Sequence, residues 1–301
     1  MAKFDPKTRT RNAVNTTCFE VSIADHIAHI VLNRPEKRNS MITAFWDELP
    51  LVISALEQDD SVRVIVISST GPHFTAGIDT AVFASNETPN EDPREVEHQK
   101  RRHGARFYDN VLRMQRTFNC LEECRVPVLA AIQGGAIGGG VDLITACDMR
   151  YMSKDGFLTI FEINIGMTAD VGTFPRITKL IPEGIARELA YTGRRMGAEE
   201  AQNIGLVNAV FDTHEELLAG VMEIAREITK KAPIAIYGSK RLITYSRDHS
   251  TADSLDYISI WNASMLNSAE VREAMSAASE KREGDFASLP PKKHTMSTTV
   301  S

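Results

Sequence analysis

Cysteines and long apolar runs are scarce in this sequence of 301 residues, and each shortage excludes a class of protein. The four cysteines are too few and too scattered for a disulfide framework, and Cys120 and Cys124 lack the second pair that would complete a zinc site. We therefore expect reduced thiols and no bound metal. No apolar run approaches the roughly 18 residues needed to cross a bilayer, so we expect no membrane span.

Targeting signals and a strong net charge are missing as well. The first residues, MAKFDPKTRTRNAV, have no apolar core for a secretory signal, and Asp5 and Pro6 disfavour an amphipathic transit helix. The last residues, TTVS, are not a peroxisomal tripeptide. The net charge of -6 gives no overall attraction to nucleic acid or anionic membranes. We expect a cytoplasmic protein that binds neither nucleic acid nor membrane.

Several familiar catalytic motifs are absent. The glycine-rich stretch GGAIGGGVDLITACD, residues 134–148, fails as a dinucleotide fingerprint, because no glycine lies two residues after Gly134 or Gly135. It also fails as a P-loop, since lysine and serine or threonine do not follow Gly139. The chain has no G-x-S-x-G elbow and no H-E-x-x-H pair. The glycines therefore require another interpretation.

Hydrophobic periodicity divides the chain into a strand-rich part and a helical part. β-Branched alternation over 18–33 predicts two short strands with a turn near Ala24 and Asp25. Further strands are predicted at 62–70, 126–133, 149–153 and 157–161, and helices at 42–56, 94–123, 183–192 and through most of the last third. Residues 84–95 are polar and rich in proline, which is typical of a surface loop. The expected class is an α/β core followed by helices.

The glycines follow a predicted buried strand and precede a helix. Backbone N–H groups at a helix start have no partner within the helix, and glycine lets a ligand approach them closely. A second such corner, FTAGID at 74–79, also follows a buried strand. Two corners of this kind could direct two N–H groups at one carbonyl oxygen, as in an oxyanion hole. The alternative is that the glycines only allow the helix to pack tightly on its strand.

Four segments together resemble the crotonase (enoyl-CoA hydratase/isomerase) superfamily. They are NRPEKRNSM, HFTAGID, AAIQGGAIGGGVDLITACDMRY and FEINIGMTADVGTFPRI, and the resemblance extends over about residues 20–245. It implies a ββα spiral core with a C-terminal helical trimerisation subdomain. It also implies that the N–H groups of Ile78 and Gly139 bind the thioester oxygen of an acyl-CoA, so that loss of a C2 proton gives a stabilised enolate.

This resemblance divides the chain into four parts. We expect an N-terminal extension at 1–17, a spiral core with the acyl-CoA site at 18–215, a helical subdomain at 216–285 and a polar tail at 286–301.

Three acids distinguish the subfamilies of this superfamily. Typical hydratases have glutamates at the positions of Asp142 and Glu162, and glycine at that of Asp170. The set present here resembles that of Δ3,5-Δ2,4-dienoyl-CoA isomerases, which implies that Glu162 handles the proton at C2 and Asp170 the proton at C6, with Asp142 supporting the network. Two carboxyl groups can divide a transfer across four carbons that one cannot easily span. The order of the two transfers stays open.

The resemblance also implies a CoA-binding surface and an assembly. Residues expected to contact the substrate, Lys240 either in its own subunit or from a neighbouring one, are Arg34, Lys37, Ala76, Gly77, Asp79, Gly138 and Lys240. Family members are generally trimers or dimers of trimers. No cofactor is expected, because coenzyme A is part of the substrate.

Other functions remain compatible with these residues. The chain could be an enoyl-CoA hydratase or a Δ3-Δ2-enoyl-CoA isomerase that uses Glu162 alone, with Asp170 only a turn former. An aryl-CoA dehalogenase would use Asp170 as nucleophile, but no matching aromatic and histidine partners are found. A non-catalytic crotonase-fold protein would not need three acids in one pocket. The preferred acyl chain is not encoded in any motif.

Overall fold

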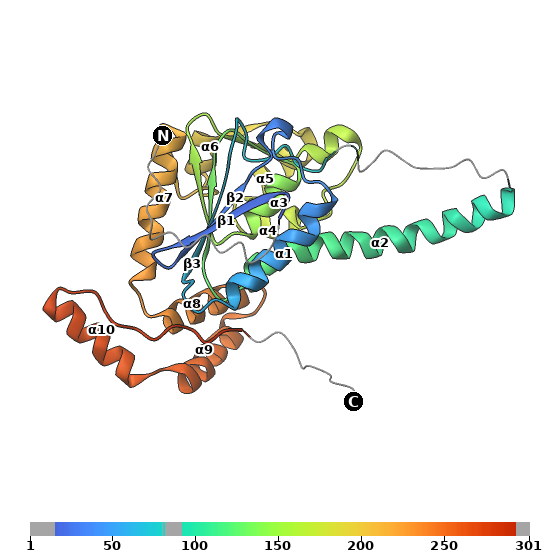
Figure 1. Cartoon of the computed structure of the whole chain (residues 1–301). Helices are drawn as coiled ribbons and strands as arrows, with labels where there is room; N and C mark the ends of the chain where they lie inside the picture. The colour runs from blue at the N-terminus through green and yellow to red at the C-terminus, as the bar shows by residue number, and fades with distance from the viewer. Residues whose placement is uncertain (1–15, 80, 82–91, 293–301) are drawn as a thin grey trace.

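The computed structural model describes residues 16–79, 81 and 92–292 (Figure 1). Within these ranges six strands form one sheet in the order β1-β2-β3-β4-β6-β9, where β1 is antiparallel to β2 and the other neighbours are parallel. The strands are Phe19–Ala24, Ile27–Leu32, Val64–Ser69, Val128–Ile132, Met149–Ser153 and Ala209–Phe211. A second sheet, β5-β7-β8, comprises Gly135–Ile137, Phe157–Thr159 and Met196–Gly197.

The predicted strands agree with this topology. The first two form a hairpin whose turn residues, Asp25 and His26, both have positive φ (51° and 66°), as a tight two-residue turn requires. Every residue of β3 is buried, as expected for a β-branched strand that is covered on both faces. Residues 1–15 of the predicted extension, 84–91 of the predicted loop and 293–301 of the predicted tail lie outside the described residues.

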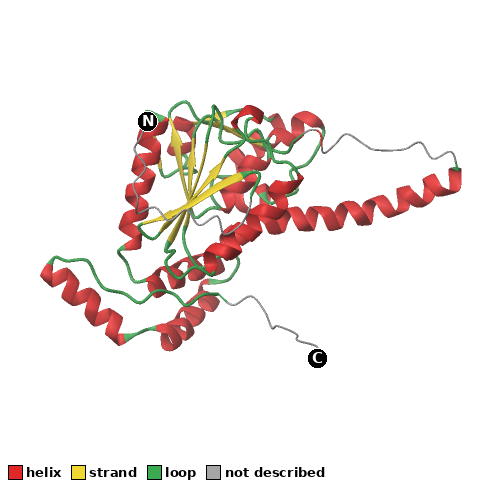
Figure 2. Ribbon diagram, viewed as in Figure 1, coloured by secondary structure: helices red, strands yellow, loops and turns green. Residues whose placement is uncertain are grey.

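Helices cover both faces of the large sheet (Figure 2). On one face α7, His214–Thr229, packs Leu217, Val221 and Ala225 against side chains of the sheet. On the other face lie α1, Thr43–Glu57, the C-terminal half of α2, Pro93–Glu123, and α3, Gly139–Ala146. The boundary expected after residue 215 falls inside α7, so the part of the chain that packs on the sheet extends further than the sequence indicated.

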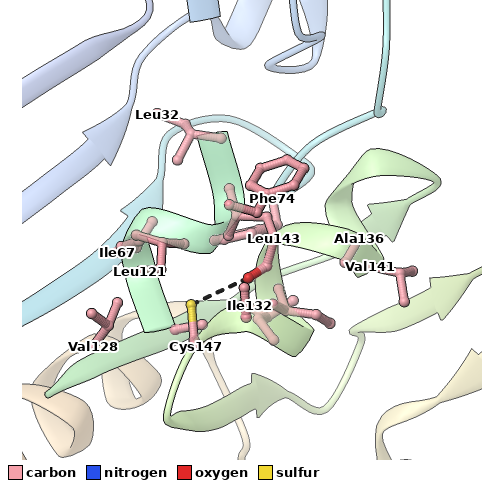
Figure 3. Close-up of a cluster of buried hydrophobic side chains, with 14 of the residues drawn as sticks. Leu32, Ile67, Phe74, Leu121, Val128, Ile132, Ala136, Val141, Leu143 and Cys147 are labelled. Carbon is pink, nitrogen blue, oxygen red and sulfur yellow. Dashed lines mark hydrogen bonds between the residues drawn. The ribbon is translucent and has the colours of Figure 1, made fainter. Parts of the chain in front are cut away.

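The core on this second face lies directly beneath the glycine-rich corner. Phe74, Ala136, Val141 and Leu143 are fully buried together, and Figure 3 shows them among the side chains of the sheet and of α2. The Cys147 thiol donates to the Leu143 carbonyl at the end of α3 (3.4 Å). All four cysteines are free thiols. The packing of Val141 and Leu143 in this core holds α3 in place. The candidate site depends on the start of that helix.

Helix α2 is only half covered. Its 31 residues correspond to a length of ~46 Å, and its N-terminal half projects beyond the body of the molecule (Figure 1). Apolar side chains recur along it every three or four residues and are buried from Met114 through Phe118 to Leu121, whereas Phe107 is 46% exposed. Periodicity correctly predicted the helix, but it did not predict that the rest of the chain covers only the C-terminal half of the helix.

Three of the remaining helices lie between β7 and β9, where only the one at 183–192 was predicted, and the other three belong to the helical last third, as expected. In chain order the remaining helices are α4 Thr173–Ile177, α5 Glu183–Thr192, α6 Ala198–Asn203, α8 Pro233–Ser246, α9 Thr251–Met265 and α10 Ser268–Glu280. No helix among the described residues is long and apolar enough to span a bilayer.

The segment after α10 returns to the body of the molecule. Phe286 is buried and its carbonyl accepts from Arg63 (3.1 Å), while Lys292 forms an ion pair with the buried Glu57 (2.7 Å). The first part of the polar tail is therefore fastened to the core.

Candidate active site

The two backbone corners lie side by side because a β-bridge joins them. Thr75 in the first corner pairs with Ala136 in the second. The Thr75 N–H donates to the Gly135 carbonyl (3.0 Å), and the Ile137 N–H donates to the Thr75 carbonyl (3.2 Å). The two segments that were separate in sequence therefore form one wall.

The direction of the Ile78 N–H follows from its neighbours. The Gly77 carbonyl accepts from the Met41 N–H (2.8 Å), and the Asp79 N–H donates to the Met41 carbonyl (3.1 Å). The N–H and the C=O of one trans peptide point in opposite directions. The N–H of Ile78, which shares a peptide with the Gly77 carbonyl, therefore points away from Met41 and toward the glycine-rich corner.

The Gly139 N–H is directed by the same logic. The Gly138 carbonyl accepts from the Val141 N–H in the first turn of α3 (2.7 Å), so the N–H of Gly139 points out of the helix start. A Cβ on Gly77 would lie 3.4 Å from the Gly139 nitrogen and 2.5 Å from the Ile137 carbonyl oxygen, so the corners approach more closely than a side chain permits. Within the described residues neither N–H donates a hydrogen bond. The pair has the arrangement of an oxyanion hole.

Asp142 lies one helical turn beyond the glycines and is 1% exposed. Its Oδ1 accepts from the Thr173 N–H (2.6 Å) and from the Thr173 hydroxyl (2.8 Å). Burial raises the pKa of this carboxyl to about 6, against the lowering effect of the Thr173 hydrogen bonds. Asp142 is thus held firmly at the start of α4.

Glu162 faces the same glycines from another element. Strand β7 ends at Thr159, so Glu162 is not at a strand end as expected but in the 3-10 turn η3, Phe161–Ile165, which Gly166 closes with φ 75°. A Cβ on Gly138 would lie 3.2 Å from Glu162 Oε1, so glycine is needed for the carboxyl to approach.

The other carboxyl oxygen of Glu162 is available for chemistry. Glu162 Oε2 is buried without a hydrogen-bond partner among the described residues. Burial, and next the charge of Asp142, raise the pKa of Glu162 to about 7. A buried, unpartnered carboxyl with such a pKa has the properties of a proton acceptor that works near neutral pH.

Asp170 completes the group from the loop before α4. Its carbonyl accepts from Gln115 Nε2 on α2 (2.7 Å), which anchors the loop. Burial raises the pKa of its carboxyl, and its charge in turn raises the pKa values of Asp142 and Glu162. The three acids therefore act electrostatically as one unit, although they come from α3, η3 and a loop.

The residues expected to contact CoA lie beside the first corner. Arg34 Nη1 donates to the Ser40 carbonyl (2.7 Å), and the Ser40 hydroxyl donates to Asp79 (2.8 Å). The Ala76 N–H donates to the Arg38 carbonyl (2.9 Å), and the Lys37 side chain is exposed. This edge of the site thus presents three basic residues, Arg34, Lys37 and Arg38, next to the oxyanion corner.

Lys240 was expected to contact CoA, and the structure corrects this. Its ammonium group donates to the carbonyls of Leu121 (2.7 Å) and Val126 (2.9 Å) and forms an ion pair with Asp148 (2.8 Å). Its side chain is 4% exposed. All three ammonium protons are used inside the fold, so Lys240 fastens α8 to the end of α2 and leaves no donor for a ligand.

Several residues that organise the site were missed by sequence reasoning. Thr173 caps the Asp142 carboxyl, and Gln115 anchors the Asp170 loop. Arg176, paired with Glu122 (2.7 Å), lowers the pKa of Asp142 by its charge. Thr173 follows Gly172 at a helix start, which is a recognisable signal. The contacts of Gln115 and Arg176 have no local signal.

Asn39 is a further missed residue, in the loop after β2. It is buried with φ 54°, and its amide donates to the carbonyls of Thr70 (2.8 Å) and His73 (3.0 Å). Its Oδ1 accepts from the Arg34 N–H (2.8 Å). Asn39 therefore ties the loop that carries the basic residues to the chain leading into the first corner.

The three acids do not form a ligand set for a metal. Among residues 16–79, 81 and 92–292, no group of three or more histidine, cysteine, aspartate or glutamate side chains is placed to hold an ion. Their arrangement instead suits proton transfer next to an oxyanion hole.

Two dienoyl-CoA isomerases are similar in sequence to most of this chain. It is 42% identical over 265 residues to the mitochondrial Delta(3,5)-Delta(2,4)-dienoyl-CoA isomerase of Rattus norvegicus, which covers 87% of this chain and 79% of the relative. It is 40% identical over 267 residues to the peroxisomal Delta(3,5)-Delta(2,4)-dienoyl-CoA isomerase of Arabidopsis thaliana, covering 87% and 93%.

The cytoplasmic location expected from the sequence is wrong in the light of these relatives, which are named as mitochondrial and peroxisomal proteins. The lack of an apolar core excludes a secretory signal, but mitochondrial presequences are amphipathic and have no such core. The presence of Asp5 and Pro6 was too weak an argument against such a presequence, so the sequence could not separate the cytoplasm from an organelle.

The fold and the family are shown by two further similarities. A crystal structure of an enoyl-CoA hydratase from Bacillus anthracis matches with a TM-score of 0.78 and 29% identity, over 90% of this chain and 99% of that chain. The sequence pattern described as Enoyl-CoA hydratase/isomerase matches residues 22–289. The resemblance to the crotonase superfamily and the expected core fold are thereby confirmed. The chain belongs to the enoyl-CoA hydratase/isomerase family.

Proposed function

We propose that this protein is a Δ3,5-Δ2,4-dienoyl-CoA isomerase. The observation that carries the proposal is the set of three electrostatically coupled acids, Asp142, Glu162 and Asp170, beside one pair of unused backbone N–H groups. Relatives at 40–42% identity that are named for this activity support it. The substrate is an acyl-CoA thioester, and no separate cofactor takes part.

The oxyanion hole would make the C2 proton removable. The thioester oxygen accepts hydrogen bonds from the N–H groups of Ile78 and Gly139, and the start of α3 favours negative charge there. When the C2–H bond breaks, its electron pair forms the C1=C2 bond of an enolate that is conjugated with C3=C4 and C5=C6, and the carbonyl pair moves to the oxygen. A single preorganised donor in such a site typically stabilises the transition state by ~3 kcal/mol.

Two carboxyl groups would then move the protons. Glu162 takes the proton from C2; as the carbonyl re-forms, the double bonds shift to C2=C3 and C4=C5, and the C5=C6 pair takes a proton from Asp170 at C6. One proton is lost and one gained, so the substrate is isomerised without net change. Glu162 ends protonated and Asp170 ionised, and exchange with solvent restores the starting forms. A pKa of about 7 for Glu162 suits this reset.

The position of Asp142 favours isomerisation over hydration. A hydratase needs two carboxyls that together hold a water molecule, whereas Asp142 Oδ1 is engaged by the backbone and hydroxyl of Thr173. Asp142 therefore supports the network and raises the pKa of Glu162. A carboxyl at Asp170, further along the acyl chain, has a use only if a distant carbon is also protonated.

We further propose that the protein assembles as a trimer or a dimer of trimers. Helices α9 and α10 carry apolar side chains at high exposure, with Leu255 at 60%, Ile260 at 56% and Met275 at 69%. Large exposed apolar surface of this kind is typical of subunit contacts. Light scattering coupled to size-exclusion chromatography tests this, and a monomer at micromolar concentration would contradict it.

The proposed activity is tested with 3,5-dienoyl-CoA substrates over a series of chain lengths. The expected result is a gain in the absorbance of a conjugated 2,4-dienoyl thioester. The Asp170→Asn variant should lose this activity, because no acid remains to protonate C6. No gain at any chain length, together with rapid hydration of a 2-enoyl-CoA, would identify a hydratase instead. Full activity of Asp170→Asn would show that Glu162 acts alone.

A further inference from the structure

Thr75 occupies the junction between the two oxyanion corners and is completely buried. Besides its β-bridge to the glycine-rich corner, it forms two hydrogen bonds with its side chain. The hydroxyl donates to the Asn39 carbonyl (2.7 Å) and accepts from the Gly77 N–H (3.1 Å). One hydroxyl therefore fixes the loop of Asn39 and the peptide that enters the first corner.

These bonds bear on the direction of the Ile78 N–H. Gly77 has φ 82°, a conformation that glycine adopts readily but that must be held in place. Its N–H is held by the Thr75 hydroxyl and its carbonyl by the Met41 N–H, so both peptide planes that flank Gly77 are fixed. The second of these planes carries the Ile78 N–H.

The methyl group of Thr75 has a separate contact. Its Cγ2 would lie 2.7 Å from a Cβ on Gly140, so the methyl fills the space next to the start of α3. The side chain thus touches the residue next to each donor, the hydroxyl at Gly77 before Ile78 and the methyl at Gly140 after Gly139. This separation allows the two contributions to be measured by different substitutions.

We propose that Thr75 is a positioning residue of the oxyanion hole, whose hydroxyl sets the direction of the Ile78 N–H relative to the Gly139 N–H. The proposal deepens the proposed function and rests on its oxyanion hole, but not on the identity of the acyl chain. Thr75 touches no reacting atom; it acts through the backbone of Gly77.

Two substitutions separate the hydroxyl from the methyl. Thr75→Val keeps the shape and removes the hydrogen bonds, and we expect kcat to fall ~10- to 100-fold, because displacement of a reacting group's partner by about 1 Å has effects of this size. The KM for the acyl-CoA should change less than about twofold, since an oxyanion hole stabilises the developing enolate more than the ground-state thioester. Thr75→Ser keeps the hydroxyl and should retain most of the wild-type kcat.

A matched control distinguishes positioning from general stability. Thr117, on α2, is also fully buried, and its hydroxyl likewise donates to a backbone carbonyl, that of Trp46 on α1 (2.8 Å). Thr117→Val should lose a similar amount of stability in a thermal melt, but its kcat should equal that of the wild type. The pH dependence of Thr75→Val should keep the wild-type midpoints, because no carboxyl is disturbed.

Exchange at C2 separates this proposal from the isomerase assignment. In deuterated water, NMR detects exchange of the C2 protons of an acyl-CoA, a reaction that needs enolate formation but no transfer to C6. We expect Thr75→Val to slow this exchange as much as it slows isomerisation. If the wild type exchanges C2 protons but does not isomerise a diene, the isomerase assignment fails, and the comparison of Thr75 variants still stands.

Two results would overturn the positioning role. One is a folded Thr75→Val protein that exchanges C2 protons at the wild-type rate. The other is a Thr75→Ser variant whose exchange is as slow as that of Thr75→Val, which would assign the effect to the methyl group. If Thr75→Val does not fold, Thr75→Cys replaces it, because a thiol is a weaker hydrogen-bonding group of similar size. Its exchange rate should lie clearly below that of Thr75→Ser, and equal rates would again refute the role.

Discussion

Replacing Asp142 by asparagine should stabilise the protein at neutral pH while impairing its site. The carboxyl is 1% exposed, and burial raises its pKa from 3.8 to about 6. The folded state therefore binds this proton more tightly than the unfolded state does. Protonation of Asp142 therefore stabilises the folded state. This contribution is complete below pH ~4 and is lost as the pH rises through the folded pKa of about 6.

The size of the effect follows from the shift. About two pKa units at ~1.4 kcal/mol each mean that the ionised carboxylate destabilises the fold by ~3 kcal/mol above pH ~7. Asparagine stays neutral, and its Oδ1 can still accept from both Thr173 donors. The variant should therefore gain on the wild type progressively between about pH 4 and 7, and the gain should be constant above this range.

Urea unfolding at several pH values, at fixed protein concentration, measures this difference. The fluorescence of Trp46, which is buried in the core, reports on unfolding. Asp212→Asn is the control, because that side chain is 75% exposed, and it should change the unfolding free energy by less than ~0.5 kcal/mol at every pH. A wild-type-to-Asp142→Asn difference that stays constant with pH would refute the argument.

Three further predictions concern the same site and its support. Ionisation of Glu162 should place a rising limb in the pH dependence of kcat/KM with a midpoint near its pKa of about 7, and a flat profile would contradict this. Gly138→Ala, at φ 52° and with its Cβ 3.2 Å from Glu162 Oε1, should lower kcat ~10-fold and the unfolding free energy by ~1–2 kcal/mol. Gly184→Ala, whose Cβ meets open space, should lower neither. Lys240→Met should lower the unfolding free energy by ~3 kcal/mol, measured by urea unfolding, because it leaves Asp148 without its buried partner, and should leave the KM for acyl-CoA unchanged. A raised KM in a stable Lys240→Met protein would instead restore this lysine as a CoA contact.

Local sequence was sufficient wherever the physical cause is local. The hairpin, the buried strands and α5 were predicted because periodicity and turn residues determine them. The corners of Ile78 and Gly139 could be predicted because glycine after a buried strand marks close backbone approach. Glu162 stays a candidate taken from the family resemblance, and its 3-10 turn was not predicted, because the strand expected at 157–161 was continued up to this residue.

Contacts over long sequence distances could not be predicted. Lys240 was expected to contact CoA, yet its carbonyl partners lie 119 and 114 residues earlier in the chain. Likewise, the regular apolar stripe of α2 gave no sign that Phe107 would be exposed while Phe118 is buried. Periodicity records which residues share a face, but not which other segment reaches that face.

The two kinds of group in this site differ in how they respond to evolution and to design. The N–H groups of Ile78 and Gly139 belong to the main chain, so most side-chain changes leave them unaltered as long as the corners keep their shape. The carboxyls stand on three separate elements, and each is replaceable by a single codon change. Substitutions can therefore change the pattern of proton delivery without changing the stabilisation of the enolate. A descendant of this chain could acquire a different reaction on the same thioester by exchanging one acid, without rebuilding the part of the fold that tolerates the charge.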